Sequence, residues 1–357
     1  MTNPLHTELC DRLGSRYPII QTAMGWVARP ELVAGTCNAG GFGFLAAGVM
    51  RADEVGPAIR RVRDMTDKPF GVNFHMFQPG AEQIVETLIN ERVRAVSFGR
   101  GPNKDMVARF RKAGILCVPT VGAVRHAQKM VELGVDMVVV QGSEGGGHTG
   151  AVASNILLPQ VLDAVKVPVV AAGGYSDGRG LAAAITVGAV GIAMGTRFLL
   201  TKDCPVPEVT KQQYLKANVD DIIVTTKIDG LPQRVVRNKR IDAMEKASTL
   251  GLIWQSIQSG LEFKKMSGAS YFDLIKSAKA MAHGGETTVW QLLMSANAPA
   301  LYQRAMLGGD PESGLMGSGQ VAGTIRELPT CNELIQRIMS EARARFTALG
   351  VPLDAAV

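Results

Sequence analysis

The stretch VPVVAAGGYSDGRGLAAAITVGAVGIAMGTRF (residues 167–198) contains one complete unit of the pattern that decides the fold. Its first apolar run covers residues 167–174, a helix-like segment follows at 178–187, and a second apolar run covers 189–198. Short, nearly continuous apolar runs are typical of buried parallel strands. Two parallel strands need a crossover of a dozen or more residues, which is usually helical. The stretch therefore predicts two parallel strands joined by a helix.

The same unit recurs toward the N-terminus. Further apolar runs cover residues 18–24, 41–47, 70–74, 95–98, 116–121 and 137–142. Apolar residues at helical spacing occupy most of the intervals between the runs, at 53–64, 81–91, 104–113, 124–133 and 156–165. Eight strands that alternate with helices are the number required for a (β/α)8 or TIM barrel. We therefore predict an α/β protein with a TIM barrel, and an open doubly wound sheet is the alternative.

The alternation of strands and helices stops after residue 201. The residues that follow are richer in Lys, Arg, Met and Ser, they include Trp254 and Trp290, and the segments 241–259 and 271–282 have helical patterns. The glycine-rich character returns at 314–323, and 333–349 predicts a closing helix. We expect residues 1–204 and 315–357 to form the barrel. Residues 205–314, called the insertion below, are expected to form a mainly helical domain that covers the substrate.

The composition excludes several classes of protein. The 40 glycines have no three-residue period and only 17 residues are proline, which excludes a collagen-like chain. A hydrophobic content of 46% with 20% charged residues is ordinary for a globular protein and argues against disorder. No run of apolar residues is long enough for a membrane span. The net charge of +6 is not arranged as a basic stripe with interleaved aromatic residues, so we expect no nucleic-acid partner.

The five cysteines are odd in number and widely spaced, and no two of them form a C-x-x-C pair. This pattern indicates neither a zinc site nor a disulfide framework. We expect reduced thiols, a cytoplasmic location and no bound metal.

Glycines gather where the predicted strands end, which is where barrels of this kind place their active sites. Gly173 and Gly174 follow the seventh strand, and Gly195 and Thr196 follow the eighth. Loops in these two positions often bind phosphate, because glycine lets backbone N–H groups approach an anion without a side chain in the way. The helix that begins at Gly178 would add an N-terminus that favours anions. The alternative interpretation is that these glycines only make tight turns.

The loop GSEGGGHTG (142–150) follows the sixth strand and is the most distinctive feature of the sequence. A flat ligand can lie against its three consecutive glycines, with His148 beside the ligand. An imidazole donates or accepts a proton near neutral pH, so His148 is a candidate acid–base residue. His75, at the end of the third strand, is a second candidate, and Glu144 is either a base or a residue that orders its own loop.

These residues resemble the nitronate monooxygenase (2-nitropropane dioxygenase-like) family of FMN-dependent barrels. The family also includes the flavin-dependent enoyl reductase of bacterial fatty-acid synthesis and a subgroup of NADH:quinone reductases. The matching elements are PIIQTAM (18–24), NAGGFGFLA (38–46), GVN (71–73) ahead of His75, GSEGGGHTG (142–150), AAGGYSDGRG (171–180), MGTRF (194–198) and GSGQVAG (317–323). They occur in order over most of the predicted barrel.

The resemblance implies that FMN binds at the top of the barrel. It places Ala23 and Met24 beside the isoalloxazine, Asn73 within hydrogen-bonding reach of the ring, Gln141 near polar atoms of the ring or ribityl chain, and Gly146 along the cofactor. It assigns the phosphate to Gly173, Gly174, Gly195 and Thr196. It also makes His148 the active-site histidine, the base that takes a proton from a carbon acid in nitronate oxidisers.

Two departures from the family bear on the substrate. Thr120 and Gln141 stand where some members have Lys and Asp, which argues against a quinone reductase. The segment TTKIDGLPQRV (225–235) and the 357-residue length are most similar to flavin oxidoreductases that act on CoA esters in steroid C/D-ring breakdown. The basic residues of 227–265 would suit the phosphates of CoA, although a solvated basic face is the alternative. We name His75, Arg234 and Arg237 as candidate substrate-binding residues.

The resemblance leaves several functions open. A CoA ester with NAD(P)H as partner is the first hypothesis. Alkyl nitronates with O2, or quinone or enoyl-thioester reduction, are the alternatives within the family. A barrel that binds a phosphate compound without flavin is the alternative outside it. A homodimer would be compatible with the sequence, which does not determine the oligomeric state.

Overall fold

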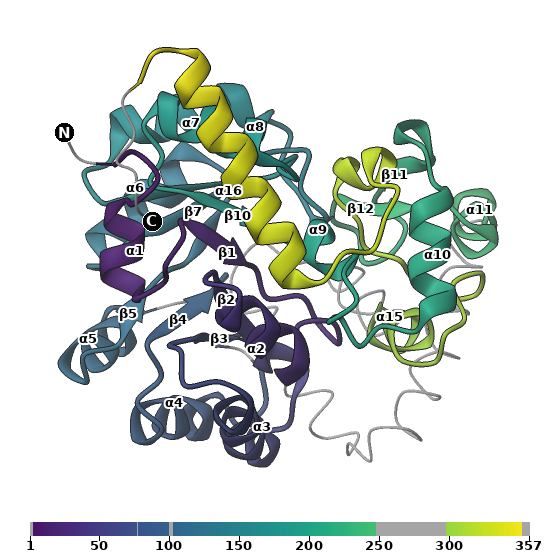
Figure 1. Cartoon of the computed structure of the whole chain (residues 1–357). Helices are drawn as coiled ribbons and strands as arrows, with labels where there is room; N and C mark the ends of the chain where they lie inside the picture. Colours follow the sequence, from purple (N-terminus) through teal and green to yellow (C-terminus); the bar gives the residue numbers. More distant parts are fainter. Residues whose placement is uncertain (1–2, 77, 100–102, 248–297, 352–357) are drawn as a thin grey trace.

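The computed structural model describes residues 3–76, 78–99, 103–247 and 298–351. Figure 1 shows a barrel with helices around it and a second group of elements beside one end of the barrel. The parallel barrel strands are β1 (Ile19–Gln21), β2 (Phe42–Ala46), β3 (Gly71–Phe74), β4 (Ala95–Phe98), β5 (Leu116–Cys117), β6 (Thr120–Val121), β7 (Val138–Gln141), β9 (Val169–Ala172) and β10 (Ile192–Met194). Each lies within one of the predicted apolar runs.

The strand order β5-β4-β3-β2-β1-β10-β9-β7-β6 begins with β5 and ends with β6, which are two pieces of the one strand predicted at 116–121. The residues that connect the two pieces bond to both neighbouring strands. Val118 N–H donates to Val96 O (2.8 Å) of β4, and Val139 N–H of β7 donates to Pro119 O (2.9 Å). Proline has no N–H for a ladder, which explains why the strand is interrupted there. The fifth strand therefore closes the sheet, so the TIM barrel is confirmed and the open sheet is wrong.

Helices surround the barrel and account for most of the predicted helical segments. They are α2 (Pro30–Asn38), α3 (Ala52–Met65), α4 (Ala81–Asn90), α5 (Lys104–Lys112), α6 (Val124–Glu132), α7 (Ser154–Ala164), α8 (Gly178–Val187) and α16 (Cys331–Ala348), with the short η1 (Ala47–Val49) after β2. The helix α2 was not predicted. It buries six of its nine residues, so it shows no clear amphipathic period.

The barrel interior has its own apolar core, separate from the layer between strands and helices. Inward-facing residues such as Phe42, Phe44 and Val139 are buried there. Leu9 and Leu13, from the short helix α1 (Glu8–Leu13), belong to the same cluster. The interior below the carboxyl ends of the strands is therefore packed, which leaves those ends as the place for a ligand.

The insertion contains α10 (Glu208–Lys216), η2 (Val219–Asp221), β11 (Ile222–Thr225), β12 (Gln233–Val236), α11 (Lys239–Lys246) and α15 (Ala298–Met306), after the short α9 (Thr196–Leu199) and before η3 (Gln320–Thr324). The predicted helix at 241–259 corresponds in part to α11. The predicted helix at 271–282, Trp254 and Trp290 lie outside the described residues. No helix in the described ranges is long and apolar enough to cross a membrane.

The two strands of the insertion were not predicted. β11 pairs with β12 in an antiparallel hairpin, and β12 pairs with β8 (Gly147–His148), which belongs to the glycine-rich loop of the barrel. All four residues of β12 are buried, including Gln233 and Arg234, so the usual alternation of polar and apolar residues is absent. The hairpin therefore attaches the insertion to the glycine-rich loop (142–150) that carries His148.

Candidate active site at the carboxyl ends of the barrel strands

The turns after β9 and β10 form adjoining backbone surfaces. The two strands pair in parallel with Ala172 opposite Ala193, so both turns leave the sheet at the same edge. Gly173 and Gly174 have φ angles of +94° and +82°, which glycine adopts without strain. The N–H groups of Gly174 and Gly195 donate to no other group among the described residues. Two free donors on adjoining turns are an arrangement that fits an anion.

The C-terminal motif GSGQVAG (317–323) reaches the same place. Gly319 N–H donates to Thr196 Oγ1 (2.8 Å), and Gln320 N–H donates to Glu144 O (2.9 Å). A Cβ atom on Gly146 would lie 2.5 Å from Gly319 N, so glycine is needed where these two backbones meet. The motif thus joins the turn after β10 to the glycine-rich loop after β7.

The N-terminus of α8 does not add a phosphate site, and that part of the prediction is wrong. The Asp177 side chain accepts hydrogen bonds from Arg179 N–H (3.0 Å) and Gly180 N–H (3.1 Å). Gly178 N–H donates to Glu341 Oε2 (2.8 Å) on α16. Because side chains already satisfy these first-turn donors, a phosphate would rely on the two turns themselves.

The loop after β1 lies beside the turn after β10. β1 pairs with β10, with Gln21 opposite Met194, and a Cβ atom on Gly195 would lie 3.3 Å from Met24 Sδ. Ala23 and Met24 are half-buried at this edge. The structure therefore places Met24 against the turn after β10, with Ala23 next to it in the chain.

Asn73 and His75 lie at the end of β3, across the barrel mouth. Asn73 is half-buried, and its side-chain N–H donates to Ser97 O (3.1 Å) on β4. The His75 backbone N–H donates to Gln78 Oε1 (2.8 Å), and a Cβ atom on Gly48 would lie 2.8 Å from the His75 ring. Both residues thus occupy the predicted end of the barrel.

Gln141, at the end of β7, orders the glycine-rich loop. Its Nε2 donates to His148 O (3.0 Å), and a Cβ atom on Gly145 would lie 2.5 Å from its Cδ. Thr120, in β6, is exposed at the same end of the barrel. The side chain of Gln141 therefore holds the backbone of the candidate acid–base residue.

His148 forms the most informative contact of the site. Its Nε2 lies 2.7 Å from Oδ2 of Asp229, and its side chain is 53% exposed whereas that of Asp229 is 8% exposed. Burial acts to raise the pKa of Asp229, but the hydrogen bond and charge of His148, together with hydrogen bonds from Gln233 and the Leu231 backbone, lower that pKa below its ordinary value. An exposed imidazole held by a buried carboxylate can exchange protons with a ligand while its ring orientation is fixed.

Sequence reasoning missed Asp229. The residue lies in the middle of the connection between β11 and β12, where Leu231 N–H donates to its Oδ1 (3.1 Å), a common role for Asp in turns. It lies within the segment TTKIDGLPQRV (225–235), whose overall similarity to a subgroup of the family singles out no residue. An Asp-Gly pair between two short apolar runs is the hairpin signal that could have located it.

Arg234, in β12 of the insertion, holds the glycine-rich loop (142–150) through its backbone. Its Nη2 and Nε donate to Ser143 O (2.9 and 3.2 Å), and the residue is 9% exposed. Burial lowers the pKa of Arg234, and nearby Glu144 partly opposes this. These contacts point to a role in holding the loop rather than to a substrate contact. Arg237 is exposed and pairs with Asp242 (2.6 Å).

Glu144 orders the loop as well. Its carboxylate accepts hydrogen bonds from the N–H (3.0 Å) and the hydroxyl (2.9 Å) of Ser154, at the start of α7. This favours the second of the two roles predicted for Glu144. Across the parts of the chain that the structure describes, no three His, Cys, Asp or Glu side chains lie together in a way that could hold a metal ion.

The basic residues of 227–265 are partly neutralised. Lys239 pairs with Glu312 (3.7 Å) in addition to the Arg237–Asp242 pair. Lys227 and Lys246 form no ion pair with another described residue. Lys264 and Lys265 lie outside the described ranges. The described part of the segment therefore offers less free positive charge than its composition indicates.

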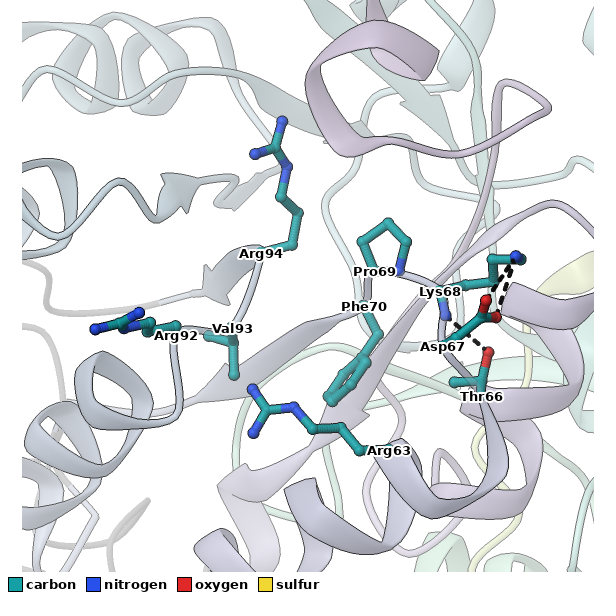
Figure 2. A pocket seen from close by; sticks show the side chains of 9 residues that line it. All are labelled: Arg63, Thr66, Asp67, Lys68, Pro69, Phe70, Arg92, Val93 and Arg94. Atoms are coloured by element: carbon teal, nitrogen blue, oxygen red, sulfur yellow. Dashed lines mark hydrogen bonds and ion pairs between the residues drawn. The ribbon is translucent and has the colours of Figure 1, made fainter.

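A separate hollow lies at the amino ends of β3 and β4. Figure 2 shows the side chains that line it, namely Arg63, Thr66, Asp67, Lys68, Pro69, Phe70, Arg92, Val93 and Arg94. Lys68 pairs with Asp67 (3.1 Å), and Arg63 pairs with Glu91 (2.5 Å). The lining residues 66–70 and 92–94 come directly before β3 and β4 in the chain, so the hollow lies at the opposite end of the barrel from His148.

Comparisons with known proteins show which family and which relatives the chain is similar to. The chain matches the family model described as "Nitronate monooxygenase" over residues 6–84 and 75–341. Two relatives are named (3aS,4S,5R,7aS)-5-hydroxy-7a-methyl-1-oxo-octahydro-1H-indene-4-carboxyl-CoA dehydrogenase. The Mycobacterium tuberculosis protein is 46% identical over 341 residues, covering 95% of this chain and 96% of the relative. The Rhodococcus jostii protein is 44% identical over 346 residues, covering 97% and 98%.

Among solved structures, FabK from Thermotoga maritima is similar to this chain with a TM-score of 0.80 and 31% identity. The match covers 96% of this chain and 98% of that one. The similarity to the two CoA dehydrogenases and to FabK therefore spans the barrel and the insertion together.

Proposed function

Because the chain belongs to the nitronate monooxygenase family, we propose that it is an FMN-dependent oxidoreductase that dehydrogenates a hydroxylated ring substrate carried as a CoA thioester. The observation that carries the proposal is the pair His148–Asp229 beside the glycine turns of the barrel mouth. It supplies a proton acceptor next to backbone surfaces that suit a phosphate-bearing cofactor.

The residues present fit FMN. The N–H groups of Gly174 and Gly195 are free to bind a phosphate, and Gly173 and Thr196 shape the two turns around them. Ala23, Met24, Asn73, Gln141 and Gly146 lie at the same end of the barrel and would hold the remainder of the cofactor. When bound, a flavin supplies the hydride acceptor of such a reaction.

We infer the substrate class from the relatives at 44% and 46% identity. Their name describes a hydroxyl group on the ring carbon next to the carbon that bears the CoA thioester. We transfer that class to this chain because the similarity covers the insertion as well as the barrel. The exact ring system and the redox partner, for which we propose NAD(P)H, are part of this proposal.

The protein's own residues would contribute position and proton transfer. His148 accepts the proton of the substrate hydroxyl, and Gln141 and Arg234 hold the loop that carries His148. We propose that the barrel (1–204 and 315–357) binds the cofactor and that the insertion (205–314) covers the substrate. His75 and Arg237 stay candidate substrate contacts in this arrangement.

Anaerobic mixing experiments on the purified protein test the proposal. We expect a visible flavin spectrum that is bleached by the hydroxylated CoA ester named for the relatives, and by NADH in the reverse direction. Bleaching by an alkyl nitronate alone would instead indicate a nitronate monooxygenase. A colourless protein that takes up no FMN would contradict the proposal as a whole.

A further inference from the structure

We propose that Asp229 is a positioning residue, which keeps the proton of His148 on Nε2 and thereby makes Nδ1 the atom that accepts a proton from the substrate. The inference rests on the proposed function in one respect, namely that His148 acts as a base. It goes beyond that function because it assigns the orientation and tautomer of the ring to a residue of the insertion.

The carboxylate of Asp229 is held in one orientation. Its Oδ1 accepts the N–H of Leu231 (3.1 Å) within the turn, which leaves Oδ2 directed at the imidazole, 2.7 Å from Nε2. The side chain is 8% exposed, so water competes little for this contact. A buried carboxylate with one oxygen already fixed gives the histidine a partner of defined position.

The backbone of His148 is held from two sides. In the antiparallel pair of β12 and β8, Gln233 lies opposite His148, and Thr149 N–H donates to Pro232 O (3.1 Å). On the barrel side, Gln141 Nε2 donates to His148 O (3.0 Å). His148 therefore lies in β8, which pairs with β12 of the insertion, and the insertion also supplies the Asp229 carboxylate.

The assignment of the tautomer follows from hydrogen-bond chemistry. A neutral imidazole carries its proton on one nitrogen, and an ionised carboxylate only accepts hydrogen bonds. Facing Asp229, Nε2 must therefore be the donor. Nδ1 then keeps its lone pair, and it forms no hydrogen bond to the described part of the chain. A proton from a substrate hydroxyl binds there, and the carboxylate balances the charge of the resulting imidazolium.

An Asp229→Asn variant separates this role from the role of Asp229 in its turn. The amide oxygen still accepts the Leu231 N–H, so the turn keeps its hydrogen bond. The amide nitrogen, however, donates toward Nε2 and favours the proton on Nδ1. A residue that only stabilises the turn would tolerate this change.

Nitrogen-15 NMR of histidine-labelled protein tests the proposal without any need for turnover. His148→Gln identifies the ring signals of His148. We expect the wild-type ring to carry its proton on Nε2, and the Asp229→Asn ring to move it to Nδ1. Asp220→Asn, an exposed carboxylate of the same insertion, is the matched control and should leave the signals in place.

Kinetics provide the second arm. We expect Asp229→Asn to lower kcat on the order of 10- to 1000-fold, which is less than the full contribution of a general base, with KM, flavin content and melting temperature nearly unchanged. A wild-type proton on Nδ1, or an unchanged tautomer in Asp229→Asn, overturns the proposal. Because the NMR arm needs neither flavin reduction nor the CoA ester, failure of the proposed function would be seen separately.

Discussion

The two halves of the candidate site are built in different ways. The turns after β9 and β10 come from adjacent units of the barrel, and their shape is a local property of Gly173, Gly174 and Gly195. The acid–base half joins His148 to Asp229, which lies 81 residues further along the chain in the insertion. The half proposed to bind the cofactor is therefore a feature of the barrel, whereas the proposed acid–base half exists only when the insertion docks on the barrel.

Gly174→Val should have the largest effect, on the barrel half. A β-branched residue is strained at a φ of +82°, and its side chain would occupy the approach to the free N–H groups. We expect the variant to purify without flavin, measured from the absorbance of the isolated protein. Gly114→Val is the matched control, because Gly114 also has a positive φ of +74° and a Cβ atom added there would have no neighbour within 4 Å. A yellow Gly174→Val protein would refute the phosphate placement.

His148→Ala should affect only the acid–base half. Loss of a general base lowers turnover by about 10²- to 10⁴-fold. Flavin content should stay at the wild-type level, since His148 is not part of the two turns. Steady-state rates and absorbance of the same preparation measure both quantities, and His126→Ala, on the exposed side of α6, is the control. Parallel loss of flavin and turnover would make His148 a structural residue.

Arg234→Met sharpens the comparison by loosening the contact between the insertion and the glycine-rich loop within the acid–base half. The change removes the guanidinium donors of Ser143 O, which keeps only the hydroxyl of Thr149 (2.9 Å), and a hydrogen bond from a charged group is worth about 1.5–3 kcal/mol. We expect a lower melting temperature and a reduction in kcat smaller than that of His148→Ala. Arg237→Met, at an exposed pair, should leave the melting temperature nearly unchanged, and a rise in KM for the CoA ester there would support the predicted substrate contact. An unaltered melting temperature in Arg234→Met would remove the structural role.

Tyr302→Phe should give the smallest effect. Tyr302 of α15 stacks on Trp26 of the β1 loop with ring centroids 6.0 Å apart, and its hydroxyl donates to Gln233 Oε1 (2.9 Å). The variant keeps the stack and loses one hydrogen bond, worth about 0.5–1.5 kcal/mol. Chemical unfolding measures the change. A loss well above that range would mean that the hydroxyl holds the insertion in place.

The predictions from sequence succeeded where structure is local. The eight apolar runs and the helices between them appear in the barrel because burial of a short continuous run specifies a strand without reference to its partners. They failed for α2 and β12, where burial on most sides removes the periodicity. They also failed for β11, which is a strand of only four residues with two of them buried. The positive φ angles of Gly173 and Gly174 agree with the predicted turns, whereas the capping of α8 by Asp177 and Glu341 could not be anticipated in full.

The amino-acid sequence by itself therefore determined the barrel, the glycine turns at its strand ends and the histidine that follows three glycines. Each of these depends on residues that are close in the chain. Only the tertiary structure decided that the fifth strand closes the sheet at Pro119, that Arg234 holds Ser143, and that Asp229 faces His148. Those contacts join segments far apart in sequence, and their existence depends on how a buried hairpin packs rather than on any local preference.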